Sequence, residues 1–221
     1  KRREQAMTEE VASALSAGDT AWIMTSAALV LLMLPGLALF YGGMTRAKST
    51  LNMMMMVLGA LFLMGVLWVL YGYSMAFGTD AFGGLVGEPF EYFGLEGLMV
   101  DDPEATFPAM AFVAFQCLFA AITVALIAGA IADRAKFATW MVFAGIWGTI
   151  VYFPVAHWVW GEGGWIFEGT GLLAPFTNDG ETAVIDFAGG TAVHINAGAA
   201  ALALVFVLGK RLGWPKTPMK P

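Results

Sequence analysis

The sequence predicts an all-α, polytopic membrane protein: a helical bundle with about five transmembrane helices. Three observations support this fold class, namely an apolar composition, five long apolar runs, and an alternation of charge between those runs. Hydrophobic residues make up 59% of the chain, charged residues 13%, and the mean hydropathy is +0.72. Soluble domains are about 45–50% apolar and about 25% charged. So few charges could not cover a soluble surface, whereas a lipid-facing surface needs none.

The five apolar runs are the predicted helices. None of them contains Lys, Arg, Asp or Glu. Each is long enough for a helix to cross a hydrocarbon core of about 30 Å. In chain order they are residues 22–44, 51–77, 107–132, 138–160 and 187–208.

The connections between the runs alternate in charge. Lys and Arg follow the first, third and fifth runs, as in Arg46, Arg134 and Lys210, whereas the second and fourth connections contain neither and carry acids instead. The positive-inside rule then places the N-terminus outside the cell membrane and the C-terminal tail in the cytoplasm. These boundaries give an extracytoplasmic N-terminal segment (1–20), a transmembrane domain (21–209) and a basic cytoplasmic tail (210–221).

The basic residues Lys1, Arg2 and Arg3 conflict with an outside N-terminus. Met7 offers one explanation, because a natural start there would leave the first six residues as an upstream remnant. A signal peptide is the alternative, although its basic stretch should lie next to a short apolar core, and here residues 8–20 intervene.

Polar side chains enter the fifth run, where ionisable groups are costly and usually face a cavity or a partner. Asp186 at its start is expected to cap the helix, and its charge could also attract a cation. We expect His194, near the middle of the run, to line a pore, because a neutral imidazole at that depth needs a hydrogen-bond partner. His157, near the outer end of the fourth run, is expected to be structural or interfacial.

Aromatic side chains supply the other candidates. Phe115 and Phe119 are four residues apart and share a helix face, which fits core packing or lipid contact as well as a functional surface. Trp160, with Trp158 and Trp165 nearby, is typical of an interface anchor, and it could also hold a cation against its ring. Cys117 is the single cysteine, so no disulfide can form within the chain. We expect no enzymatic activity, metal site, cofactor or nucleic-acid partner, and membrane lipid as the surroundings.

These features together resemble the N-terminal half of the ammonium transporters of the Amt/Mep/Rh group. The matching segments occur in family order and cover nearly everything after Met7. They are PGLALFYGGM at 35–44, WVLYGYS at 68–74, FQ at 115–116 with FA at 119–120, WVWG at 158–161, and DFAGGTAVHIN at 186–196.

The resemblance implies a role for each candidate. Trp160 and Phe119 would be the aromatic walls of an outer ammonium site, supported by the carboxylate of Asp186. Phe115 and Phe119 would form a stacked gate below that site, and His194 would be the first of two pore histidines. The protein would then recruit ammonium at an acidic, aromatic mouth and conduct it through a narrow apolar pore.

The same resemblance implies what surrounds the chain. Family members have about eleven spans in two inverted five-helix repeats, so this chain would be the first repeat, an N-terminal fragment without the second histidine. A homotrimer and a cytoplasmic regulator of the PII type are also implied. Two alternatives remain open: an ammonium sensor that shares the membrane domain, and a gas channel of the Rh type.

Overall fold

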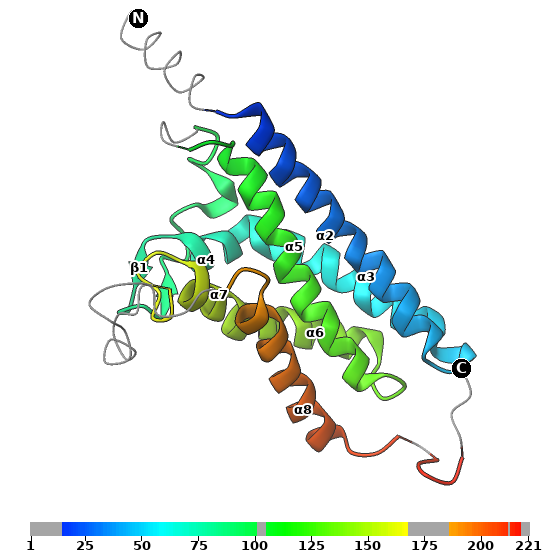
Figure 1. The fold of residues 1–221 in the computed structure, drawn as a ribbon. Coiled ribbons are helices and arrows are strands. Elements are labelled where there is room, and N and C mark those ends of the chain that lie inside the picture. Colours follow the sequence, from blue (N-terminus) through cyan, green and yellow to red (C-terminus); the bar gives the residue numbers. More distant parts are fainter. Residues whose placement is uncertain (1–14, 101–104, 168–185, 212, 218–221) are drawn as a thin grey trace, which may run out of the picture.

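The computed structural model describes residues 15–100, 105–167, 186–211 and 213–217. Within them it contains five helices long and apolar enough to cross a membrane, which confirms the predicted fold class (Figure 1). They are Ala17–Gly43, Ala47–Phe77, Ala109–Ile131, Phe137–Trp160 and Gly190–Leu208. The largest differences from the predicted runs are at the first helix, which starts at Ala17 rather than residue 22, and at the second, which starts at Ala47 rather than residue 51. The predictions for Lys1 to Arg3 and for Met7 lie outside the described residues.

Most spans consist of consecutive segments with different helical geometry. The second, fourth and fifth spans each include a π-helical turn of five or six residues. The segments are α2 (Ala17–Gly43); η1 (Ala47–Ser49), α3 (Thr50–Leu67), η2 (Trp68–Gly72) and α4 (Tyr73–Phe77); α5 (Ala109–Ile127) and η4 (Ala128–Ile131); α6 (Phe137–Trp147), η5 (Gly148–Tyr152) and α7 (Phe153–Trp160); and η7 (Gly190–Ile195) and α8 (Asn196–Leu208).

The first helix, α2, begins at a serine cap, since Ser16 Oγ accepts the N–H of Asp19 at 3.1 Å. It continues through Pro35. Gly36 is exposed, and no other side chain lies within 4 Å of the position its Cβ would take. Gly36 therefore makes no tight contact with a neighbouring helix among the described residues.

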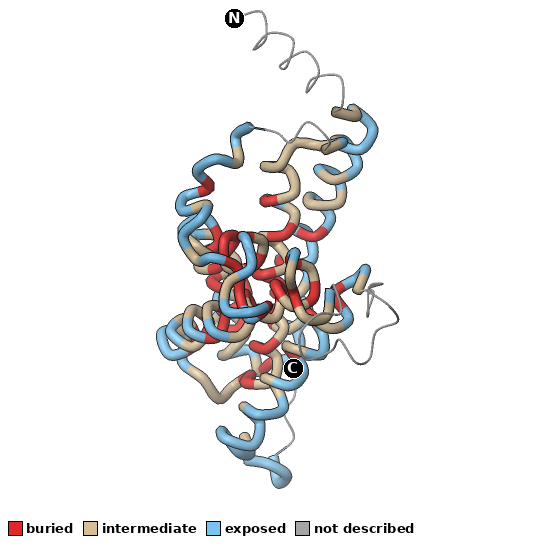
Figure 2. Tube along the Cα trace, turned by 90° about the vertical axis from the view of Figure 1, so that its left-hand side faces the viewer, coloured by how far each residue is buried: buried red, intermediate tan, exposed pale blue. Residues whose placement is uncertain are grey.

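The core lies among the middle helices. The helices α2, α3 and α5 pack against one another, α6 packs against α3, and α8 packs against α5 and η4 (Figure 1). Half of the α5 span is buried but only 17% of the α2 and α8 spans, and the buried residues gather at the centre of the bundle (Figure 2). Helices α2 and α8 thus leave wide apolar faces uncovered.

Aromatic side chains tie the spans together through polar atoms. The buried indole of Trp68 donates to the carbonyl of Val113 at 3.1 Å, and that of Trp140 donates to the carbonyl of Met56 at 2.9 Å. The hydroxyls of Tyr71 and Thr149, 2.9 Å apart, bring the π-helical turns of the second and fourth spans to one level. Because lipid offers no alternative partner, such bonds fix the register of neighbouring helices.

The cation-bearing connections meet at one end of the bundle. The buried carboxylate of Asp133 lies 3.4 Å from Arg46 Nε and 3.8 Å from Arg211 Nη1. Arg134 Nη1 donates to the carbonyl of Gly209 at 2.5 Å. The loops after the first, third and fifth spans therefore share one face, as the charge alternation predicted.

The opposite end carries the connection between the second and third spans. Two short antiparallel strands, β1 (Asp80–Ala81) and β2 (Val86–Gly87), form a hairpin with Asp80 paired to Gly87. A 3-10 turn, η3 (Phe93–Leu95), follows. This hairpin is the one β element among the described residues. The acids Asp101, Asp102 and Glu104 of this connection, and Glu168, Asp179 and Glu181 of the next, lie outside the described residues.

Candidate functional site: an aromatic row beside an apolar groove

Asp186 holds the start of the fifth membrane helix. Its Oδ1 accepts the N–H of Gly190 at 2.8 Å, and its Oδ2 accepts those of Thr191 at 2.8 Å and Ala192 at 3.0 Å. The first N–H groups of a helix have no partner within the helix, and its positive end favours an anion. The prediction that Asp186 caps this helix is confirmed.

The helix begins later than the apolar run suggested. Gly189 has a left-handed backbone with φ of +72°, and a Cβ there would lie 2.6 Å from Val193 Cγ2. The helix therefore starts at Gly190, so Asp186 lies before its first turn rather than within it. We had expected His194 near the middle of the apolar run. It lies instead about one turn after the start of the helix.

Trp160 is fixed by the backbone of the same aspartate. Its indole Nε1 donates to the carbonyl oxygen of Asp186 at 2.9 Å, which joins the end of α7 to the start of the fifth helix. The Trp160 ring meets Phe119 at a centroid distance of 6.0 Å, and Phe119 meets Phe115 at 4.8 Å. The three half-buried rings thus form a continuous aromatic row. Phe115 and Phe119 are edge to face, with planes 88° apart, rather than stacked.

An apolar groove of about 320 Å³ lies beside this row. Phe119 lines it, and His194 supplies the one titratable side chain in its wall. The other residues lining it are Met33, Gly36, Leu37 and Phe40 from α2, Ile122 and Leu126 from α5, and Ala188 and Val193. The His194 ring is exposed and makes no hydrogen bond within the described part of the chain. Phe119 thus belongs to both the aromatic row and the groove, whereas Phe115 and Trp160 line only the row.

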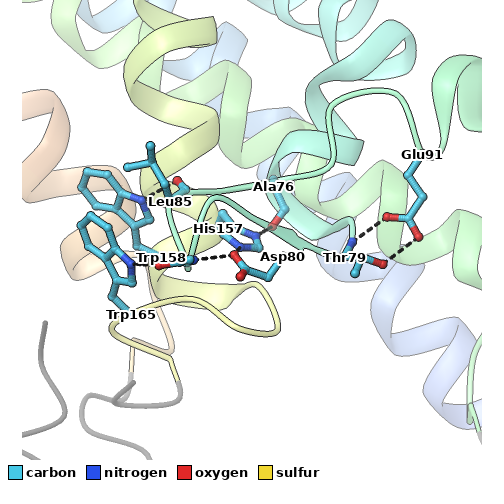
Figure 3. A network of polar contacts seen from close by, with 10 residues as sticks. Ala76, Thr79, Asp80, Leu85, Glu91, His157, Trp158 and Trp165 are labelled. Atoms are coloured by element: carbon cyan, nitrogen blue, oxygen red, sulfur yellow. Dashed lines mark hydrogen bonds and ion pairs between the residues drawn. The ribbon is translucent and has the colours of Figure 1, made fainter. Parts of the chain in front are cut away.

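The outer face is held together by a polar network (Figure 3). The stacked indoles of Trp158 and Trp165, 4.9 Å apart, donate at 2.7 Å to the carbonyls of Leu85 and Gly83. Glu91 accepts the backbone N–H of Thr79 at 2.6 Å and its hydroxyl at 3.0 Å. These tryptophans, which sequence reasoning treated as interface anchors, therefore also anchor the hairpin. The partners are 73 and 82 residues apart, and no local signal could have paired them.

An outer pocket of about 390 Å³ adjoins this network. Asp80 and Glu162 place carboxylates in its wall beside Thr79 and Tyr92. Burial, followed by the charge of Glu91, raises the pKa of Tyr92 above its ordinary value. The acidic character that we predicted for the outer loops is therefore present at this end of the bundle.

The fold and the site define a polytopic membrane protein with an aromatic row at one end of an apolar groove. A family model described as "Ammonium Transporter Family" matches residues 21–221. The chain belongs to that family.

Similar proteins agree with this assignment. The chain is 56% identical to an ammonium transporter of Mycobacterium tuberculosis over 220 residues, covering 92% of this chain and 45% of that protein. It is 46% identical to one from Aquifex aeolicus, covering 89% and 43%. The crystal structure of Saccharomyces cerevisiae Mep2 superposes with a TM-score of 0.75 at 32% identity, covering 91% and 43%. The chain thus spans about half the length of these relatives.

Proposed function

We propose that this chain forms one side of a transmembrane path for ammonium and ammonia. The observation that carries the proposal is the apolar groove in which Phe119 and His194 share one wall. Relatives up to 56% identical are named ammonium transporters.

The outer end of the path is suited to a small cation. A cation next to the faces of Trp160 and Phe119 is attracted by their ring quadrupoles, with a contribution of about 0.5–2 kcal/mol. Asp186 holds the indole of Trp160 through its carbonyl while its carboxylate binds three N–H groups. We infer that Asp186 supports the ammonium site by fixing Trp160 and adding negative potential, and that it does not contact the ion.

The groove itself is suited to the neutral molecule. Moving an unpaired ion into an apolar interior costs on the order of tens of kcal/mol in the ideal limit. Ammonium that passes the Phe115 and Phe119 gate would therefore cross as ammonia. In this account the His194 ring accepts the proton that ammonium releases and offers a hydrogen-bond partner to the ammonia, in a wall with no other titratable side chain.

The path needs a second side. Helix α2 and the η7 turn of the fifth span border the groove, and only 17% of the first span and of the fifth span is buried in this chain. We propose that the remaining length seen in the relatives covers this face.

The cation-rich end would then be cytoplasmic and the hairpin end outside. The expected trimer and PII-type regulator stay predictions. The sensor alternative rests on likeness of fold alone. A structure described as "Sensor Amt Protein" superposes with a TM-score of 0.73 at 24% identity.

Uptake of labelled methylammonium by lipid vesicles tests the proposal. Vesicles that contain this chain together with the remaining half of the protein should accumulate the label well above empty vesicles. Vesicles that contain this chain without that half should match empty vesicles, because the groove would stay open to lipid. Uptake by the isolated chain would contradict the two-sided path, and absence of uptake by the combined halves would contradict transport.

A further inference from the structure

His157 has an unusual hydrogen-bond environment on α7, near the outer end of the fourth span. Its side chain is fully buried, and each ring nitrogen faces an oxygen from a distant part of the chain (Figure 3). Nδ1 lies 3.2 Å from the carbonyl oxygen of Ala76, and Nε2 lies 3.3 Å from Asp80 Oδ1. These contacts join α7 to the end of the second span and to the outer hairpin.

Both oxygen partners are acceptors only. A backbone carbonyl carries no proton. The Asp80 side chain is 32% exposed to solvent, and its Oδ1, the atom that faces the ring, also accepts the N–H of Gly84 at 2.6 Å. A neutral imidazole has one N–H and one lone pair, so one of its two contacts would set a lone pair against an oxygen. An imidazolium has two N–H groups and satisfies both partners.

We propose that His157 is a protonation-controlled latch for the outer hairpin. In the charged form it clamps Asp80, and with it the turn to Gly84, onto α7. When the proton leaves, the ring can donate to only one of the two partners, and its contact with Asp80 loses its charge assistance. The hold on the Asp80 turn therefore weakens, while Trp158 and Trp165 still donate to the turn carbonyls of Leu85 and Gly83. The latch therefore closes when the ring gains its second proton and opens when the ring loses it as the pH rises. This inference does not depend on the proposed transport.

The packing around the latch leaves little room for other arrangements. A Cβ at Gly161 would lie 2.4 Å from His157 Nδ1, and one at Gly163 would lie 2.6 Å from Asp80 Cβ. The backbone is therefore closely fitted around both partners of the latch.

Asp80 is the one titratable side chain within hydrogen-bonding distance of the His157 ring among the described residues. Elements packed against α7 carry other titratable groups, and none of these bonds to the ring. They are Tyr73 on α4, Tyr152 on η5, His194 on η7, Glu88 after β2, and Glu162 in the turn after α7. Glu91 is bonded to Thr79.

Nitrogen NMR tests the protonation state of the His157 ring directly. The chain has two histidines, so a His194→Gln variant assigns the His157 signals. The chain is labelled with ¹⁵N-histidine and placed in lipid nanodiscs. At pH 5.5 the two His157 nitrogens should both show imidazolium shifts, and they should change to the neutral pattern by pH 8.5. A ring that is neutral throughout, or charged throughout, would overturn the latch.

Amide hydrogen exchange tests the coupling to the hairpin. After correction for the intrinsic effect of pH, protection of the Gly84 and Glu88 amides should fall about tenfold as His157 loses its proton, the loss expected for a charge-assisted hydrogen bond. Both amides are bonded within this hairpin, at 2.6 and 2.8 Å. Protection of the Thr191 amide, bonded to Asp186, should stay constant.

Two charge-matched variants separate the latch from a general effect of pH. Asp80→Asn removes the charge that holds the second ring proton, so the pH step in Gly84 and Glu88 protection should disappear. Glu91→Gln removes the same charge from the same loop but does not touch His157, and it should keep the wild-type step. A step that persists in Asp80→Asn, or that is lost equally in both variants, would overturn the proposal.

Discussion

Replacing Asp186 with alanine is expected to lower the free energy of unfolding by at least about 3 kcal/mol. The substitution leaves three N–H groups at the start of the fifth helix without their acceptor. Each hydrogen bond to a charged group contributes about 1.5–3 kcal/mol, and neighbouring bonds do not add in full. Thermal or denaturant unfolding in detergent, followed by the helical signal, measures the loss.

Two further variants identify the cause. Asp186→Asn keeps one acceptor oxygen and loses the charge, so its effect should lie between wild type and Asp186→Ala. Asp19→Ala removes an acid from the first turn of α2, where the exposed side chain accepts no backbone N–H among the described residues. It should change the free energy of unfolding by less than about 0.5 kcal/mol. If Asp186→Ala behaves like Asp19→Ala, the carboxylate is not the support that we infer.

Replacing His194 with alanine in the complete protein should change methylammonium uptake by about two- to tenfold or alter its selectivity. The imidazole is the one titratable group in the groove wall, and a hydrogen bond lost to a permeating molecule is worth about 0.5–1.5 kcal/mol. Uptake into vesicles, measured for ammonium and methylammonium side by side, reports both effects.

Asn196→Ala provides the matched control for this prediction. Asn196 lies two residues further along the same helix, but its amide donates to the carbonyl of Ala192 at 3.3 Å and does not line the groove. Its replacement should leave uptake near the wild-type level. Wild-type uptake of both substrates by His194→Ala would remove His194 from the path.

The membrane helices were predictable because hydropathy over about 20 residues is a strong and local signal. The cap was predictable for a similar reason, since a carboxylate near a helix start can accept the N–H groups that have no partner within the helix. The position of His194 was predicted less well, because the left-handed Gly189 delays the helix by a few residues and apolar composition does not reveal this.

Contacts between distant segments were not predictable from the sequence. His157 was expected to be structural or interfacial, and its buried position agrees with a structural role. Its pairing with Asp80, however, joins residues 77 positions apart. The buried Asp133 between Arg46 and Arg211 is equally hidden, because a loop acid gives no sign of burial. The roles proposed for Phe115, Phe119, Trp160 and His194 stay predictions, although the structure does bring these side chains together along one aromatic row and groove.

Thiol modification of the groove tests the central claim most directly. Gly36 lines the groove and a Cβ there meets nothing within 4 Å, so Gly36→Cys should fold normally. Gly65→Cys is equally uncrowded but lies on α3 away from the groove. Both are made in the complete protein with Cys117 replaced by alanine. A small methanethiosulfonate reagent, with labelling confirmed by mass spectrometry, should reduce methylammonium uptake by about tenfold in Gly36→Cys and leave Gly65→Cys unchanged. Full labelling of Gly36→Cys with undiminished uptake would contradict a path through this groove.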